Sequence, residues 1–141
     1  FLNSKKALIM NIFANAATAA VNLMYTNPPL SPEDAWIQAL KSLGAKQSVI
    51  EKGCPKNAFI GLCESGKIKS IPAALNIKGG LNADYALDAL LHLQTLSKQP
   101  ATIEHSELWA HVMSLENRDI DKKHNQQMHV VLGLWNSGLI V

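Results

Sequence analysis

Two stretches of the chain, residues 61–68 and residues 133–140, share the pattern G-L-x-x-S-G-x-I. In each stretch the second glycine follows an apolar run and precedes a return toward an isoleucine. A glycine in this position is typical of a helix end, because it adopts the left-handed backbone conformation without a steric penalty. The pattern predicts two helices that end in the same way, and it favours a fold made of two related halves, residues 1–78 and 79–141. Coincidence is the alternative, since such helix ends are common.

The order of the predicted elements agrees with two related halves. Each half has a helix rich in alanine and asparagine, then a helix with a tryptophan (Trp36 and Trp109), then a helix that ends in the shared pattern. We therefore predict a single, mainly α-helical domain over residues 1–141, with about six helices, and the two related halves would each be a three-helix, helix-turn-helix-like unit. The returns at residues 67–71 and 138–141 are expected to form at most a short strand pair.

The first half contains clear helix signals. A helix is expected over about residues 4–25, with an inward face made of Leu8, Ile12, Ala16, Ala19 and Leu23. The next helix begins at Ser31, a favourable N-cap, and ends at Gly44. Its predicted inward residues are Trp36, Ala39, Leu40 and Leu43.

A short turn and a third helix follow. Ser48 and Glu51 have capping-box spacing over the turn. Cys54-Pro55 then opens a helix that Gly66 ends.

The second half repeats this course. A helix is expected from Asn82 to about Gln99, with inward residues Tyr85, Ala86, Ala89, Leu90, Leu93 and Leu96. A tryptophan helix follows, from residue 102 or 106 to residue 115. After a break around residues 117–123, the last helix runs to Gly138.

The composition indicates a soluble globular protein. The chain has 141 residues, 48% hydrophobic and 17% charged, with a net charge of +2. No stretch approaches the roughly 20 apolar residues of a membrane span, and residues 1–23 are expected to form an amphipathic helix rather than a secretory signal. The two cysteines lack C-x-x-C spacing, which favours reduced thiols and a cytoplasmic location.

Charge is unevenly distributed along the chain. Residues 41–78 hold seven lysines against two glutamates, including Lys52, Lys56, Lys67 and Lys69. Residues 79–121 hold seven acids against two basic residues. Such a division either makes the surface self-complementary or directs an anionic partner to the lysine-rich surface, which we define as the lysines of residues 41–78.

Cys54 is the one candidate for reactivity. It lies at the expected start of a helix between Lys52 and Lys56, and both a helix N-terminus and nearby cations favour a thiolate. A nucleophilic enzyme also needs a base, and no histidine lies near Cys54 in sequence. A packed, unreactive cysteine is the simpler interpretation.

The histidine spacing does not predict a metal site. His105 and His111 lie six residues apart and His124 and His129 five apart, so neither pair has the i, i+4 spacing that places two ligands on one helical face. Sequences typical of phosphate loops or dinucleotide sites are absent as well. We therefore expect neither a metal nor a cofactor.

A nucleic-acid partner is a further hypothesis. In helix-turn-helix-like halves, Lys67 and Lys69 would lie where they can contact phosphates, and Asn125 and Gln126 at the start of the last helix would be able to read base edges. The single arginine, Arg118, argues against a tight phosphate binder.

Residues 52–71, K-G-C-P-K-N-A-F-I-G-L-C-E-S-G-K-I-K-S-I, resemble the signature of a family of small uncharacterised domains. N-A-D-Y-A at residues 82–86 and N-Q-Q-M-H-V-V-L-G-L-W at residues 125–135 belong to the same pattern, so the resemblance spans most of the chain. It implies a common fold. It implies no catalytic residue, cofactor or partner, because such domains have no established activity.

The sequence thus favours a non-catalytic binding or regulatory module in the cytoplasm. Its lysine-rich surface would engage a protein or a nucleic acid. A cysteine-dependent enzyme centred on Cys54 and a self-associating interaction protein, such as a homodimer, are the alternatives.

Overall fold

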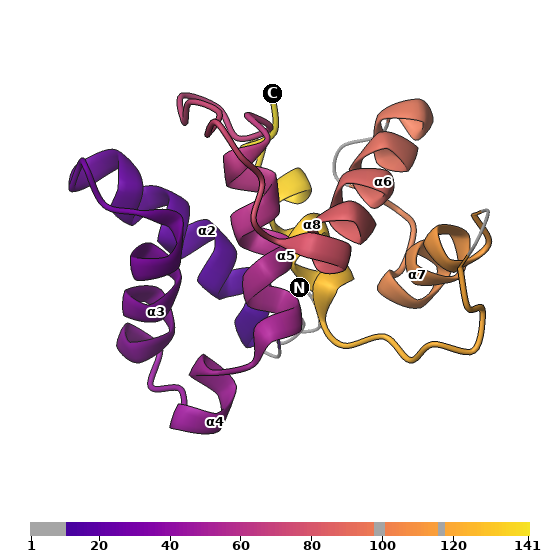
Figure 1. Ribbon diagram of the computed structural model, residues 1–141, viewed down its shortest axis with the longest axis horizontal. Helices are drawn as coiled ribbons and strands as arrows, with labels where there is room; N and C mark the ends of the chain where they lie inside the picture. The colour runs from indigo at the N-terminus through magenta and orange to yellow at the C-terminus, as the bar shows by residue number, and fades with distance from the viewer. Residues whose placement is uncertain (1–10, 98–100, 116–117) are drawn as a thin grey trace.

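The computed structural model describes residues 11–97, 101–115 and 118–141, which form seven α-helices. They are α2 (Ile12–Thr26), α3 (Pro32–Ser42), α4 (Gln47–Ile50), α5 (Gly53–Glu64), α6 (Gly80–Leu96), α7 (His105–Met113) and α8 (Gln127–Asn136). Figure 1 shows α5 and α8 at the centre, with α2 and α3 on one side and α6 and α7 on the other. The mainly α-helical prediction is confirmed. None of the described helices is both long and apolar enough to cross a bilayer.

Helix α2 presents a face of small residues to the core. Asn11 caps it, because the side-chain oxygen accepts the N–H of Ala14 at 2.9 Å. The predicted start near residue 4 and the inward Leu8 lie outside the described residues. The buried residues are Phe13, Ala16, Ala17, Ala20 and Val21. The predicted face was thus rotated: Ala16 is buried, whereas Ile12, Ala19 and Leu23 lie at the edge of the core.

Helix α3 begins as predicted, because the Ser31 hydroxyl accepts the N–H of Asp34 at 3.1 Å. Trp36, Ala39 and Leu40 are fully buried. Leu43 was predicted to point inward but is 43% exposed. The helix ends at Ser42, one residue before Leu43, and Gly44 follows in the left-handed conformation at φ +78°.

The capping box predicted for Ser48 and Glu51 is wrong. Helix α4 begins after Lys46, and no side chain caps it. Glu51 instead accepts a hydrogen bond at 2.9 Å from the Gln47 side chain, four residues earlier on the same helix turn. Gln47, Ser48 and Glu51 are all exposed, so water competes with either arrangement and the spacing alone did not decide between them.

The two shared patterns form the same structure at the ends of α5 and α8. Gly66 and Gly138 have left-handed φ angles of +77° and +72°. After α5 the N–H of Lys67 bonds to the C=O of Leu62 at 3.2 Å, and the equivalent bond after α8 has the same length. This is the hydrogen bonding of a Schellman motif, which uses carbonyls that a helix end leaves free.

The returns after the two motifs pair with each other. Ile68 and Ile140, the last residues of the two patterns, form an isolated antiparallel bridge. The N–H of Lys69 bonds to Leu139 at 2.8 Å, and the N–H of Val141 bonds to Lys67 at 2.9 Å. The short strand pair expected from the sequence is thus a single bridge among the described residues.

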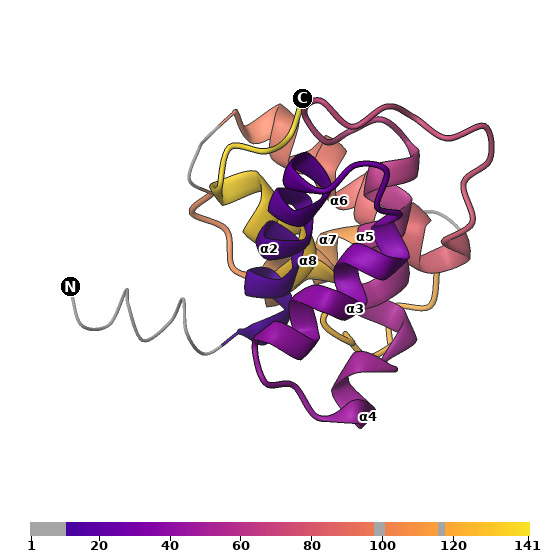
Figure 2. The ribbon, with the colours of Figure 1, turned by 90° about the vertical axis from the view of Figure 1, so that its left-hand side faces the viewer.

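Glycines allow the central helices to approach their neighbours closely. A Cβ atom built on Gly61 of α5 would lie 2.8 Å from Ala83 Cα in α6. A Cβ atom on Gly133 of α8 would lie 2.9 Å from both Cα and O of Ala14 in α2. Figure 2 shows α8 passing next to α2. Each central helix therefore packs on the first helix of the opposite half, at the first glycine of its shared pattern.

Aromatic residues fill the core on both sides. Trp36 stacks between Phe13 and Phe59, with ring centroids 6.3 and 5.3 Å away. Trp109 meets Tyr85 edge-on at 5.4 Å. In α6 the predicted inward residues are buried or partly buried except for Leu96, which is 44% exposed at the helix end. The predicted end near Gln99-Pro100 lies outside the described residues.

Candidate functional site

The four lysines predicted to bind a partner lie at two ends of one helix. Lys52 and Lys56 are at the start of α5, whereas Lys67 and Lys69 follow its end. A helix of 12 residues is about 18 Å long, so the two pairs lie on separate parts of the surface. These four lysines therefore do not form one patch.

The lysines at the start of α5 have partners within the chain. Lys56 lies 3.7 Å from the carboxylate of Glu33, and the ammonium of Lys52 lies 5.9 Å from the centre of the Phe13 ring. Both side chains are partly buried. Lys67 and Lys69 are exposed, so of these four lysines they are the best placed to meet another molecule.

The two positions predicted to read bases make internal hydrogen bonds, Gln126 through its side chain and Asn125 through its backbone N–H. The Gln126 side chain accepts a hydrogen bond from Asn11 at 3.5 Å, and the N–H of Asn125 bonds to the Gln127 side chain at 2.8 Å. Gln127 is completely buried and donates to Asn82 at 3.0 Å. These contacts connect the start of α8 to α2 and α6, which gives the side chains of Gln126 and Gln127 a structural use.

Cys54 lies in the first turn of α5 and is half-buried. Every histidine that the structure describes belongs to α6, α7, α8 or the segment between α7 and α8. Within the described residues no histidine or carboxylate hydrogen-bonds to Cys54. The geometry therefore supplies no base for this thiol.

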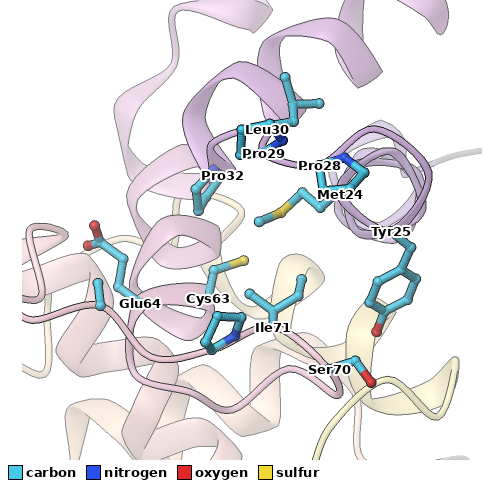
Figure 3. A pocket seen from close by; sticks show the side chains of 12 residues that line it. Met24, Tyr25, Pro28, Pro29, Leu30, Pro32, Cys63, Glu64, Ser70 and Ile71 are labelled. Carbon is cyan, nitrogen blue, oxygen red and sulfur yellow. The ribbon is translucent and has the colours of Figure 1, made fainter.

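A cavity of about 610 Å³ lies where the ends of α2 and α5 meet the return after α5. Sequence reasoning missed it, since its lining comes from segments that lie far apart along the chain. Figure 3 shows Met24, Cys63 and Ile71 around its centre. The lining residues are Met24, Tyr25, Pro28, Pro29, Leu30, Pro32, Cys63, Glu64, Ser70, Ile71, Pro72 and Ala74.

The polar groups of this cavity are held by backbone partners. Tyr25 donates its hydroxyl hydrogen bond to the carbonyl of Lys69, and Glu64 accepts the N–H of Lys78 at 2.7 Å. Burial, with a smaller contribution from Cys63, raises the pKa of Tyr25. Burial and the neighbouring Glu64 raise the pKa of Cys63 to about 12, so this thiol is neutral at pH 7. The cavity is therefore mostly apolar, and its charged lining residue, Glu64, lies at the edge.

The loop that continues from the cavity exposes apolar side chains. Leu75 is 103% exposed and Ile77 is 50% exposed. Leu81, at the start of α6, is 62% exposed. Leu75 directly follows Ala74 of the cavity wall, so exposed apolar side chains continue from the cavity along this loop, and exposed apolar surface next to a cavity is characteristic of binding sites.

Three histidines also come together, although their spacing did not indicate it. His105 opens α7, His124 precedes α8 and His129 lies in α8, and one nitrogen of each is within 4.8 Å of the others. Burial lowers the pKa of both His124 and His129 to about 4, with smaller contributions from neighbouring histidines. The i, i+4 rule detects ligands on one helix only, whereas these residues come from three segments.

The fold and these features define an all-helical domain whose candidate sites are an apolar cavity and a group of three histidines. The chain belongs to the family described as "Family of unknown function (DUF6979)", which matches residues 10–141. The expected membership of a family of uncharacterised domains is thereby confirmed. No curated protein and no solved structure matches the chain.

Proposed function

We propose that the chain is a non-catalytic module that binds a protein partner by enclosing an apolar segment of that partner in the cavity between α2 and α5. The observation that carries the proposal is the cavity itself. Its volume of about 610 Å³ lies within the range of ligand sites, and its wall is mostly apolar. Met24 provides an adaptable side chain of the kind common at peptide-binding surfaces.

The polar groups of the wall support binding more than catalysis. The Cys63 thiol stays protonated at neutral pH, and a protonated thiol is a poor nucleophile. The Tyr25 hydroxyl and the Glu64 carboxylate are each engaged by the backbone. These groups fix the shape of the cavity.

The surroundings of the cavity favour a protein over a nucleic acid. The exposed Leu75 and Ile77 extend the apolar surface, which suits a partner with apolar side chains. Lys67 and Lys69 are exposed next to Ser70 in the cavity wall, and they favour acidic residues beside the apolar segment.

The helices proposed for groove binding are poorly placed for that use. A recognition helix must present one face to the major groove. In α5 seven of twelve residues are buried, and α8 buries its first two residues, Gln127 and Met128. This favours a structural use of both helices.

Selection of displayed random peptides on the wild-type chain tests the proposal. We expect the enriched peptides to share apolar residues with acidic neighbours. Ala74→Trp adds a large side chain at the exposed edge of the cavity, whereas Ala110→Trp makes the same change at an exposed site on α7. The enriched peptides should bind the Ala110→Trp variant normally and lose binding to the Ala74→Trp variant, as measured by fluorescence anisotropy. Equal binding to both variants would contradict the proposal.

The role of the two exposed lysines is tested separately. The double variant Lys67→Ala, Lys69→Ala should bind an acidic peptide about threefold more weakly at low salt, because each exposed charge pair contributes little to affinity. Lys41→Ala with Lys46→Ala removes two exposed lysines elsewhere and should have no effect. If both double variants behave alike, the lysines do not select the partner.

Self-association is the second candidate, and the exposure of Leu75 favours it. Leu75 of one copy would enter the cavity of another, so Leu75→Ser should lower the sedimentation mass of any oligomer.

An enzyme centred on Cys54 requires an unusually acidic thiol, which the pH dependence of its alkylation would reveal. We infer a cytoplasmic location from the two free cysteines, which cell fractionation would test.

A further inference from the structure

His105, His124 and His129 form a compact group where the start of α7 meets the start of α8. His105 is the first residue of α7, His129 lies in α8, and His124 lies in the segment that connects them. The ring centroids of His105 and His129 are 4.2 Å apart, and those of His124 lie 5.3 and 5.4 Å from the other two. All three side chains are partly exposed, so an ion can reach them from solvent.

The spacing of the nitrogens is close to that of a metal centre. One ring nitrogen of each histidine lies within 4.8 Å of the other two. A tetrahedral zinc ion with bonds of about 2.0–2.1 Å holds its ligand nitrogens about 3.3 Å apart. Closing this difference requires each ring to move by about 1 Å or less toward a common centre, which small side-chain rotations provide.

We propose that His105, His124 and His129 bind a divalent transition-metal ion, with Zn²⁺ as the expected ion and a fourth position open to solvent. Imidazole nitrogens suit zinc, copper and nickel, whereas calcium and magnesium prefer oxygen ligands. Cys54 and Cys63 belong to α5, so the donor set has three nitrogens and no thiolate. Three histidines with an open position are a known zinc arrangement.

The surroundings hold the rings in place. Trp109 lies 5.2 Å from the ring of His124. Its own position is fixed by Tyr85, which it meets edge-on, and by a hydrogen bond of 2.9 Å to the carbonyl of Lys122. Lys122 is two residues before His124, so the same hydrogen bond restrains the segment that carries His124. Restraint of this kind favours metal binding, because fewer rotations are lost when the ion binds.

One hydrogen bond of His124 is lost when the metal binds. His124 Nε2 accepts the N–H of Met128 at 3.0 Å, so in a neutral ring the proton is on Nδ1. If Nε2 binds the ion it no longer accepts this N–H, and if Nδ1 binds the ion the proton moves to Nε2. In both cases the Met128 N–H loses its acceptor. The Met128 amide is therefore a specific reporter of metal binding through His124.

The test is calorimetric titration of the full, untagged chain with ZnCl₂, since a polyhistidine tag would bind the ion itself. We expect one ion per chain. His105→Gln and His129→Gln should each weaken binding about a hundredfold, as expected for the loss of one nitrogen ligand. Circular dichroism and thermal unfolding of the metal-free variants establish that they are folded.

The chain contains a matched control. His92 and His111 stack at 3.6 Å between α6 and α7. His92→Gln and His111→Gln should change zinc affinity by less than about threefold, because these rings are not ligands. Co²⁺ in place of Zn²⁺ should give the visible absorption of a tetrahedral site in the wild type and in both control variants.

Two results would overturn the proposal. The first is an absence of one-to-one zinc binding in the wild type, or retained affinity in the folded His105→Gln and His129→Gln variants. The second is an NMR spectrum of the backbone amides in which saturating zinc leaves the Met128 N–H signal unchanged. The spectroscopic experiment uses the wild type alone, so it decides the question even if a variant does not fold.

Discussion

Replacing Gly61 with alanine tests the closest contact between the two sides of the fold. Gly61 lies in α5, where it faces Ala83 of α6. The added Cβ atom would lie 2.8 Å from Ala83 Cα and would also overlap the Ala83 methyl group. Neither atom is the end of a flexible side chain, so relief requires the two helices to move apart.

The expected loss of stability follows from two opposing effects. Overpacking a tight contact costs about 1–3 kcal/mol, and contact with backbone places this case at the upper end. Alanine in place of a helical glycine returns about 1 kcal/mol. We therefore expect the free energy of unfolding to fall by about 2 kcal/mol, with a decrease in Tm of roughly 6–8 °C for a domain of this size.

Urea unfolding followed by circular dichroism measures this change, and Gly53→Ala is the matched control. Gly53 lies in the same helix, but the nearest atom to its added Cβ would be the Asn57 amide nitrogen at 3.8 Å. This variant should be neutral or up to about 1 kcal/mol more stable. Removing the opposing methyl in the Gly61→Ala, Ala83→Gly double variant should recover part of the loss. If Gly61→Ala is as stable as Gly53→Ala, the close approach of α5 and α6 is wrong.

Further predictions concern the cap of α3, the cysteines and acid stability. Ser31→Ala should lower the free energy of unfolding by about 1 kcal/mol in urea titrations, because Ser31 accepts an N–H at the start of α3; no change would argue against the cap. In native protein at pH 7.5, iodoacetamide should modify the half-buried Cys54 before Cys63, which is buried and has a pKa near 12; peptide mass spectrometry identifies the order, and faster modification of Cys63 would contradict it. In metal-free protein His124 and His129 have a pKa of about 4, against about 6.5 when unfolded. The unfolded state therefore binds more protons between these two pKa values, so the protein should become less stable as the pH falls. The two pKa shifts together, halved because both side chains are partly exposed, lower the free energy of unfolding by about 3 kcal/mol from pH 7 to pH 4. A urea midpoint that stays constant over this pH range would refute the prediction.

Local signals predicted the helices of this fold well. The start of α3 at Ser31 and the ends of α5 and α8 at Gly66 and Gly138 depend on backbone chemistry within a few residues, so the sequence displays them directly. The rotation of α2 was not visible, because alanines and larger apolar residues both fit a helical stripe. The structure buries Ala16, Ala17 and Ala20 on this helix, and it brings Gly133 of α8 close to Ala14.

The candidate sites depend on distant contacts, which explains why the sequence did not reveal them. The cavity brings Met24 together with Cys63 and Ile71, which are about 40 residues or more away along the chain. The histidine group joins three segments, and its members have no common helical spacing. Conversely, Lys52 and Lys69 are close in sequence, but α5 separates them in space.

The interpretation as two related halves leads to one more prediction. Equivalent residues of the two halves make reciprocal contacts: Gly61 of α5 faces Ala83 of α6, and Gly133 of α8 faces Ala14 of α2. Ile68 and Ile140, which are also equivalent, pair with each other. The ends of α2 and α6 also border cavities in both halves, of about 610 Å³ at Met24 and about 90 Å³ at Leu93 and Leu96. We infer that the halves are related by an approximate two-fold axis through the bridge between the two returns.

Such an axis predicts the length of an engineered connection from residue 140 to residue 11. Residues 69–79 lead from Ile68 to the first residue of α6, so eleven residues span this path. By the symmetry, eleven residues should also span the path from Ile140 to Asn11. A permuted chain that begins at Gly80, continues through Val141 and a ten-residue Gly/Ser linker to Asn11, and ends at Gly79 should therefore fold with a Tm close to that of a linear chain lacking residues 1–10. If the permuted chain folds only with a linker of about twice that length, the two paths differ and the halves are not related in this way.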